Sequence, residues 1–265
     1  MESSKGITRR RFIGDSARAA VCLSTLGGIE SILAACTKQQ VVDFHGVPST
    51  LVLEDEFTKM DTWKWEWRID GDAYHSLTPE GVKLGVKATA DDKSYSNSEF
   101  YNHGLPYKYN FAQIRLKNDN LEKGTRGWGF WNGSMVRGPI KLAWFTQRQG
   151  PEDYERNGFW AVTANEGKSK WTPIENIPLE DWNTYSIDWG QDGVTWWIND
   201  MLVAEERAIV PNGKMRVDIW IDNAVYQVIN NINTHIYQNI IKETSLRVDN
   251  LKVLKLTKPY SPGTR

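Results

Sequence analysis

The sequence predicts an all-β domain, a sandwich of two antiparallel sheets. From Leu51 onward, apolar and polar residues alternate with a period of two, and turn-forming residues separate the alternating stretches. A hairpin pattern at 184–206 supports the same fold class. At 265 residues, the chain is long enough to bury a large core in one such domain.

The first 35 residues have the features of an export signal. Residues 8–12 (TRRRF) form a twin-arginine motif, and a weakly apolar stretch precedes residues 33–36 (LAAC), which match a lipobox. In a lipobox the cysteine receives a lipid after cleavage of the signal. These motifs predict a signal peptide over 1–35 and lipidation of Cys36. We therefore expect export by the twin-arginine route and a lipid anchor at the periplasmic or outer face of the cell envelope.

Composition argues against several other classes of protein. Of the two cysteines, Cys22 lies in the predicted signal, so we expect no disulfide in the mature domain. Removing residues 1–35 takes away five of the 32 Lys and Arg and three of the 33 Asp and Glu, which leaves 27 and 30. Such a balance lacks the basic stripe of a nucleic-acid-binding protein. No transmembrane run follows Cys36, so the expected membrane contact is the lipid alone.

The predicted domain spans 50–257 and follows a lipid-anchored tether at 36–49. Val82, Leu84 and Val86 alternate with polar or small residues, which predicts an early strand. The stretch 111–117 alternates in the same way.

The C-terminal part contains the clearest turn signals. Within 184–206, Asp192-Gly193 and Asn199-Asp200 are typical of tight turns, so three consecutive strands are predicted there. Residues 245–256 predict a closing strand, and 258–265 a flexible tail.

One stretch departs from the period of two. Between 225 and 241 the apolar residues are spaced by four, three, four and four, at Val225, Ile229, Ile232, Ile236 and Ile240. This spacing predicts a short helix near 225–241, although the intervening asparagines favour turns.

The order of these segments resembles the concanavalin A-like jelly roll of glycoside hydrolase family 16, the laminarinase and lichenase group. DEF at 55–57 resembles its opening strand, and FAQIRLKNDN followed by GWGFWNG is similar to its framing strand and glycine- and tryptophan-rich strand. WNTYSIDWGQDGVTWWINDMLV and LRVDNLKVLKL resemble its hairpin and last strand. The resemblance covers most of 51–256 and implies a jelly roll that acts on β-linked polysaccharides.

The catalytic signature of that family, Glu-x-Asp-x-(x)-Glu on one strand, is absent. Retaining hydrolysis needs two carboxyls about 5–5.5 Å apart, on one face of the strand. In the corresponding stretch IKLAWFTQRQG (140–150), the expected positions hold Leu142, Trp144 and Gln147. A glutamine can hydrogen-bond a sugar but cannot transfer the proton. The residues therefore predict that the activity is lost or relocated.

Three acids are the candidates for a relocated catalytic site: Asp222, Asp153 and Glu155. The last two lie in GPEDYERNG (150–158), whose Gly-Pro and Asn-Gly also predict a solvated turn. On MRVDIWIDN (215–223), Asp218 and Asp222 share one strand face but are about 13 Å apart, too far for a catalytic pair. Either one would need a partner from another strand.

The thirteen tryptophans predict a saccharide-binding surface. Flat aromatic rings desolvate the apolar faces of pyranoses, while flanking polar groups bind the hydroxyls. In GWGFWNG, Trp128 and Trp131 lie on opposite strand faces, so one faces the core and the other the ligand. The predicted binding residues are Trp128, Trp131, Trp144, Gln147, Asp218, Trp220, Asp222 and Asn223.

The resemblance also implies a calcium ion near the first and last strands, where Glu56 and Asp249 stand. The four histidines show no metal spacing. Three functions remain open from the sequence. The chain is a carbohydrate-binding or carbohydrate-processing lipoprotein, an active O-glycosyl hydrolase with relocated acids, or a structural lipoprotein whose aromatic groove receives another protein.

Overall fold

The computed structural model describes residues 40–133, 139–229 and 232–262. Within the compact unit Val41–Arg265, these residues form strands β1 to β18 and no helix, and all of the strand pairs are antiparallel. No helix in the described ranges is long and apolar enough to cross a membrane. The predicted all-β class is confirmed.

One large sheet has nine strands and includes the predicted three-stranded hairpin. Its main path runs through β1 (Val41–Phe44), β2 (Val47–Asp55), β18 (Thr244–Leu256), β7 (Phe111–Asp119), β12 (Asn183–Trp189), β13 (Val194–Ile198) and β14 (Met201–Glu206). β5 (Gly81–Val86) also pairs with β18, and β4 (Ala73–Thr78) pairs with β5. Asn199 and Asp200 both have positive φ, which is typical of the two-residue turn predicted between β13 and β14.

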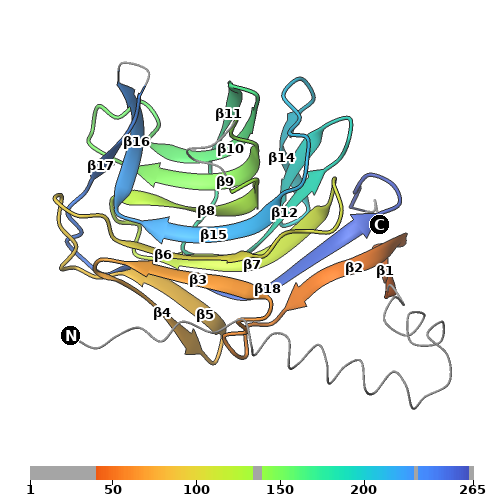
Figure 1. Ribbon diagram of the computed structural model, residues 1–265, viewed down its shortest axis with the longest axis horizontal. Helices are drawn as coiled ribbons and strands as arrows, with labels where there is room; N and C mark the ends of the chain where they lie inside the picture. The colour runs from red at the N-terminus through yellow and green to blue at the C-terminus, as the bar shows by residue number, and fades with distance from the viewer. Residues whose placement is uncertain (1–39, 134–138, 230–231, 263–265) are drawn as a thin grey trace, which may run out of the picture. The chain divides into compact units, whose positions relative to one another are not determined.

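The other large sheet has seven strands. Its order is β11 (Lys168–Ile174), β10 (Gly158–Asn165), β9 (Leu142–Gln149), β8 (Gly124–Trp131), β15 (Arg216–Asp222), β6 (Asn97–Asn102) and β3 (Trp65–Asp70). Figure 1 shows this sheet curving over the nine-stranded one. The two antiparallel sheets form a sandwich, as predicted for a concanavalin A-like jelly roll.

The core lies between the two sheets because each strand buries one of its two faces. Val82, Leu84 and Val86 of β5 are buried as their alternation predicts. They belong to one cluster with Trp128 of β8 and Ile219 of β15, from the opposite sheet. The other face of the seven-stranded sheet is therefore free to carry a site.

The predicted helix at 225–241 is wrong. The segment forms the hairpin β16 (Ala224–Ile229) and β17 (Ile232–Tyr237), which stands beside β15 at one edge in Figure 1. A spacing of four residues is also a multiple of two, so most of the apolar spacing fits a strand as well as a helix. Valine and isoleucine, which are β-branched, favour the strand.

The domain extends further at both ends than predicted. Strand β1 and the start of β2 lie within 41–49, which the sequence assigned to a tether. This segment joins the domain because the ring of Phe44 packs against that of Phe111, with centroids 4.9 Å apart. Tyr260, in the predicted flexible tail, is buried beside the same ring at 4.8 Å. Its hydroxyl donates to Asp200 Oδ1 at 2.8 Å. Residues 36–39 and 263–265 lie outside the described residues.

Candidate saccharide site

The candidate site lies on the outer face of the seven-stranded sheet. On β15, Val217, Ile219 and Ile221 belong to the core. Alternation therefore places Asp218 and Trp220, with Arg216 and Asp222, on the other face. We call this surface the Trp220 face. It consists of the residues that lie on the same side as Trp220 in strands β3, β6, β8, β9, β10, β11 and β15.

Tryptophan rings from three adjacent strands meet on the Trp220 face. The ring centroid of Trp144 (β9) lies 4.6 Å from that of Trp220 (β15) and 6.0 Å from that of Trp131 (β8). Trp160 and Trp171 extend this aromatic cluster onto β10 and β11. The structure thus brings together three tryptophans that the sequence proposed for saccharide contact.

The glycines of β8 make room for these rings. A Cβ atom on Gly127 would lie 2.9 Å from Cη2 of Trp220, and one on Gly129 would lie 2.8 Å from Cδ1 of Trp144. Both separations are shorter than normal carbon contacts. The combination of glycine and tryptophan in GWGFWNG therefore lets indoles from the neighbouring strands lie against the β8 backbone.

Trp128 is not part of the site. It is 1% exposed and packs in the core, where its ring stacks on Phe145 at 5.8 Å. The strand alternation was correct, but Trp131 is the residue that faces outward. Trp128 therefore stabilises the sandwich rather than touching a ligand.

No outward residue of β9 is an acid. The register with β8 and β10 places Leu142, Trp144, Thr146 and Arg148 on the Trp220 face. The sequence of this strand was compared above with the family's catalytic stretch, and none of its four outward side chains is a carboxylic acid.

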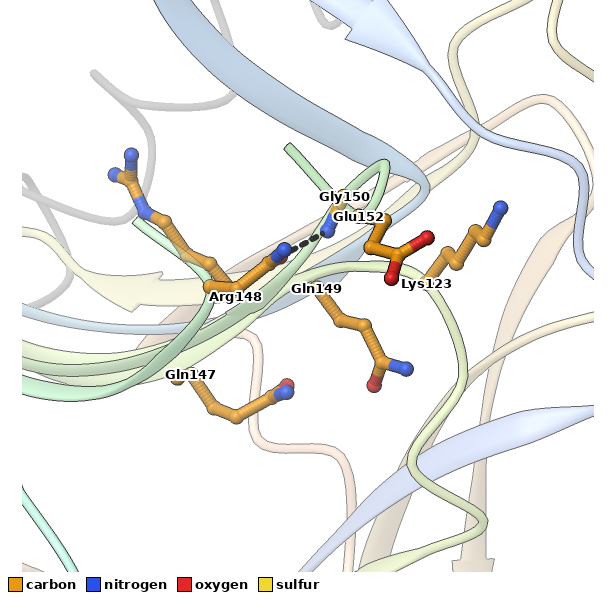
Figure 2. A pocket seen from close by; sticks show the side chains of 8 residues that line it. Lys123, Gln147, Arg148, Gln149, Gly150 and Glu152 are labelled. Carbon is orange, nitrogen blue, oxygen red and sulfur yellow. Dashed lines mark hydrogen bonds between the residues drawn. The ribbon is translucent and has the colours of Figure 1, made fainter. Parts of the chain in front are cut away.

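Gln147 points to the opposite side of β9, so its predicted place in the saccharide site is wrong. It pairs with Arg126, which is buried on the inner side of β8. Figure 2 shows Gln147 and Gln149 on one side of the strand and Arg148 on the other. The first two line a cavity of about 500 Å³ together with Lys123 and Glu152.

Acids occur instead on the neighbouring strands β6 and β15. Glu99 stands directly opposite Trp220 in the register, and Asp218 is its diagonal neighbour. Burial, followed by the proximity of Glu99, raises the pKa of Asp218 well above its usual range, although Arg216 opposes that shift.

Asp222 is the centre of a second polar cluster at the end of β15. It accepts hydrogen bonds from the backbone N–H of Ala224 at 2.9 Å, the Tyr226 hydroxyl at 2.8 Å and the Tyr95 hydroxyl at 3.3 Å. Burial raises the pKa of Asp222 to about 6, against the lowering effects of these partners and of Arg148. Arg148 stacks over Tyr226, with its guanidinium 5.3 Å from the ring centroid.

Three other predicted residues lie away from the face. The Asn223 amide is buried and donates to the carbonyls of Asp91 and Ser94, while its oxygen accepts from the backbone N–H of Ser96. Asn223 therefore anchors a loop. Asp153 and Glu155 are exposed in the turn between β9 and β10, where no strand aligns them with another acid.

Glu56 and Asp249 line one cavity, as the calcium expectation requires, but the residues present do not fit the ion. The guanidinium of Arg115 lies 2.6 Å from Oδ2 of Asp249, so a cation already occupies that carboxylate. Among the described residues, no group of three histidines, cysteines or acids could hold a metal. We derive no role for calcium.

The sequence did not identify Glu99, Asn97 or Arg148 as site residues. Residues 97–102 (NSEFYN) contain few large apolar residues, so the period of two is hard to recognise. In β6, Ser98 and Phe100 are buried on the inner side, which turns Asn97, Glu99 and Tyr101 outward. Alternation around Phe100 was the signal that could have found Asn97 and Glu99, and alternation around the buried Phe145 of β9 could have found Arg148.

No family model matches the sequence, and no curated protein matches it. Solved structures do share the fold. A κ-carrageenase from Pseudoalteromonas carrageenovora in complex with a κ-carrageenan oligosaccharide aligns with a TM-score of 0.55 and 14% identity, over 83% of this chain and all of the other. The β-glucanase of Bacillus licheniformis aligns with a TM-score of 0.53 and 14% identity, over 78% of this chain and 98% of the other.

The catalytic domain of a Thermotoga petrophila endo-1,3-β-glucanase aligns with a TM-score of 0.54 and 13% identity, over 80% of this chain and all of that domain. The similar structures include glucanases, carrageenases and lichenases, so the jelly roll expected from the family 16 resemblance is confirmed. At these identities the similarity shows the fold alone.

Proposed function

We propose that this protein binds a polysaccharide on the Trp220 face. The observation that carries the proposal is a set of indole N–H groups without partners. Nε1 of Trp131, Trp144 and Trp171 is buried and has no hydrogen-bond acceptor among the described residues. All three indoles lie on the Trp220 face. When a sugar ring packs on aromatic side chains, its hydroxyl oxygens can accept hydrogen bonds from their indole N–H groups.

The fold supports the same class of ligand. Proteins of similar structure carry names of enzymes that act on glucans and galactans. We infer that this chain uses the face for binding without the usual retaining hydrolysis, because the outward residues of β9 contain no acid.

A panel of polysaccharides tests both parts of the proposal. The domain is incubated with laminarin, lichenan, agarose and xylan, binding is followed by tryptophan fluorescence, and new reducing ends are assayed in the same samples. We expect a saturable fluorescence change with at least one polysaccharide and no new reducing ends. The absence of binding to all four would contradict the proposal and favour a protein partner for the aromatic face.

Hydrolysis by relocated acids is the second candidate function. It is favoured by Asp222, a buried acid on the same sheet face whose pKa of about 6 suits proton transfer near neutrality. Release of reducing ends that Asp222→Asn abolishes would establish this function. Release that survives simultaneous Asp222→Asn, Asp153→Asn and Glu155→Gln would place the reaction elsewhere.

We also propose that the mature protein is anchored by a lipid on Cys36, which lies outside the described residues. Replacing Cys36 with alanine should move the exported protein from the membrane fraction to the soluble fraction. Retention of the variant at the membrane would contradict the lipid anchor without affecting the saccharide proposal.

A further inference from the structure

Glu99 and Asp218 form a buried carboxyl pair in the middle of the Trp220 face. Glu99 is 7% exposed and Asp218 3% exposed, they are diagonal neighbours across β6 and β15, and the negative charge of Glu99 raises the pKa of Asp218. Two carboxylates can hydrogen-bond to each other only if one of them keeps its proton, and two adjacent buried negative charges would repel strongly. Asp218 therefore holds its proton to higher pH than an exposed aspartate would, since burial and the nearby Glu99 raise its pKa.

The pair has acceptor atoms that no described residue satisfies. Oδ1 of Asp218 is buried without a hydrogen-bond donor. A second orphan acceptor comes from a different side chain, Asn97, which is 1% exposed. Its Nδ2 donates to Glu99 Oε2 at 3.1 Å, so its amide lies against the pair, while its Oδ1 has no partner. Buried acceptors are costly without donors, and ligand hydroxyls would supply them.

Two arginines lie near the pair. Nε of Arg68 lies 2.7 Å from Oδ2 of Asp70, and its Nη1 lies 3.5 Å from Oε2 of Glu99. The Arg216 guanidinium lies 3.4 Å from the ring centroid of Tyr101 and 4.8 Å from that of Trp131. The centre of the face therefore offers acceptors and an acid proton, while Arg68 is paired with Asp70 and Glu99, and Arg216 lies over two aromatic rings with its Nε unpartnered.

We propose that Glu99 and Asp218 share a single proton and act as the hydroxyl-binding and specificity-determining pair of the saccharide site. In this arrangement Trp220, directly across from Glu99, presents its ring to the sugar, while Asp218 Oδ1 and Asn97 Oδ1 accept its hydroxyl protons. An anionic sugar would meet the negative charge of the pair and be rejected. The inference rests on the proposed function, because it assigns residues within the same site.

The main test compares isosteric amide variants with a variant of the aromatic platform. Kd is measured for laminarin, lichenan, agarose and xylan, with a sulfated galactan and alginate as anionic probes, for the wild type and for Asp218→Asn, Glu99→Gln and Trp144→Ala. We expect Asp218→Asn and Glu99→Gln to weaken binding of the neutral ligand about tenfold, the scale of one hydrogen bond to a charged group. Discrimination against the anionic probes should decrease. Asp249→Asn, on the other sheet, is the control and should leave Kd unchanged.

A second measurement uses only the wild type, so it does not depend on the variants folding. A bound sugar excludes water and further disfavours a second negative charge, so affinity should fall as the pH rises and Asp218 loses its proton. The charged and titratable groups that share the face are Arg68, Glu66 and Asp70 on β3, Tyr101 on β6, Arg148 on β9, and Arg216 and Asp222 on β15, whereas Gly127 and Gly129 of β8 bear none. Calorimetry in two buffers of different ionisation enthalpy detects proton uptake on binding at that pH.

The outcomes separate the two proposals. Binding that Trp144→Ala weakens, but that neither amide variant changes, would overturn the role of the pair and leave the saccharide site intact. Tighter binding of an anionic probe than of any neutral polysaccharide would also overturn it. If the amide variants do not fold, an affinity that does not fall with rising pH, together with binding without proton uptake, would overturn the role of the pair. Failure of the wild type to bind any polysaccharide would overturn the proposed function as well.

Discussion

At the scale of single residues, Asp222 shows how burial couples a site residue to stability. Its pKa is raised to about 6 in the folded protein, from an ordinary value of 3.8. The native state therefore holds this proton at pH values where the unfolded chain has released it. The corresponding stability is fully present below pH 3.8 and is lost as the pH rises to 6.

Asp222→Asn should remove the pH-dependent stability that comes from the Asp222 proton, because an amide does not titrate. The shift corresponds to about 3 kcal/mol, so the unfolding free energy of the wild type relative to the variant should fall by roughly that amount between pH 4 and pH 7. Urea unfolding at intervals across this range measures the difference. Asp153→Asn, at an exposed position, is the matched control. A wild type-to-variant difference that stays constant with pH would refute the raised pKa.

The sequence predicted a site residue correctly where apolar and polar residues alternate clearly along its strand. Asp218, Trp220 and Asp222 were found because the residues between them are strongly apolar. Trp128 was misplaced because both faces of β8 carry large rings, so alternation gives two sets without saying which is inside. Gln147 was misplaced because a family motif with an optional residue does not fix the strand parity. The Glu99–Asp218 contact depends on cross-strand register, which sequence alone does not contain.

At the scale of elements, β8 is a backbone platform for the indoles of its neighbours. Gly127→Ala would add a Cβ atom 2.9 Å from Cη2 of Trp220 and 2.3 Å from the carbonyl oxygen of Phe145. Because the second atom is backbone and cannot move freely, we expect a loss of about 1–3 kcal/mol in unfolding free energy. Denaturant unfolding tests this, with Gly190→Ala as control, where the added atom would meet its nearest neighbour at 3.5 Å. Equal losses in the two variants would contradict the platform role.

The elements themselves were mostly predictable, and the exceptions have physical causes. The β12–β13–β14 hairpin followed from its turn residues, and β5 from its alternation. The β16–β17 hairpin was mistaken for a helix because a spacing of four is common to both periodicities. Strand β1 and Tyr260 were assigned to loose ends because short segments show no period, and only tertiary contact with Phe111 orders them.

At the scale of the whole molecule, the shared fold does not by itself determine the function. Alternation along the chain and a resemblance to one family were sufficient for the jelly roll, which is shared with several polysaccharide hydrolases. The outward residues of β9 include Trp144 and Arg148 and no acid, so the proposed binding function rests on this chain's own residues and not on the shared fold. A common sandwich can carry different sites on one sheet face.

The most direct test of the account asks whether the outer face of the seven-stranded sheet is where the saccharide binds. The polysaccharide that binds best in the panel is titrated by calorimetry into the wild type, Trp144→Ala and Trp182→Ala. Trp182 is a matched control because it stacks with Arg115 and Lys117, which lie on β7 of the other sheet. Thermal unfolding verifies that each variant is folded. The account predicts that Trp144→Ala weakens binding at least tenfold while Trp182→Ala leaves Kd unchanged. Weakening by Trp182→Ala with full affinity in Trp144→Ala would contradict it.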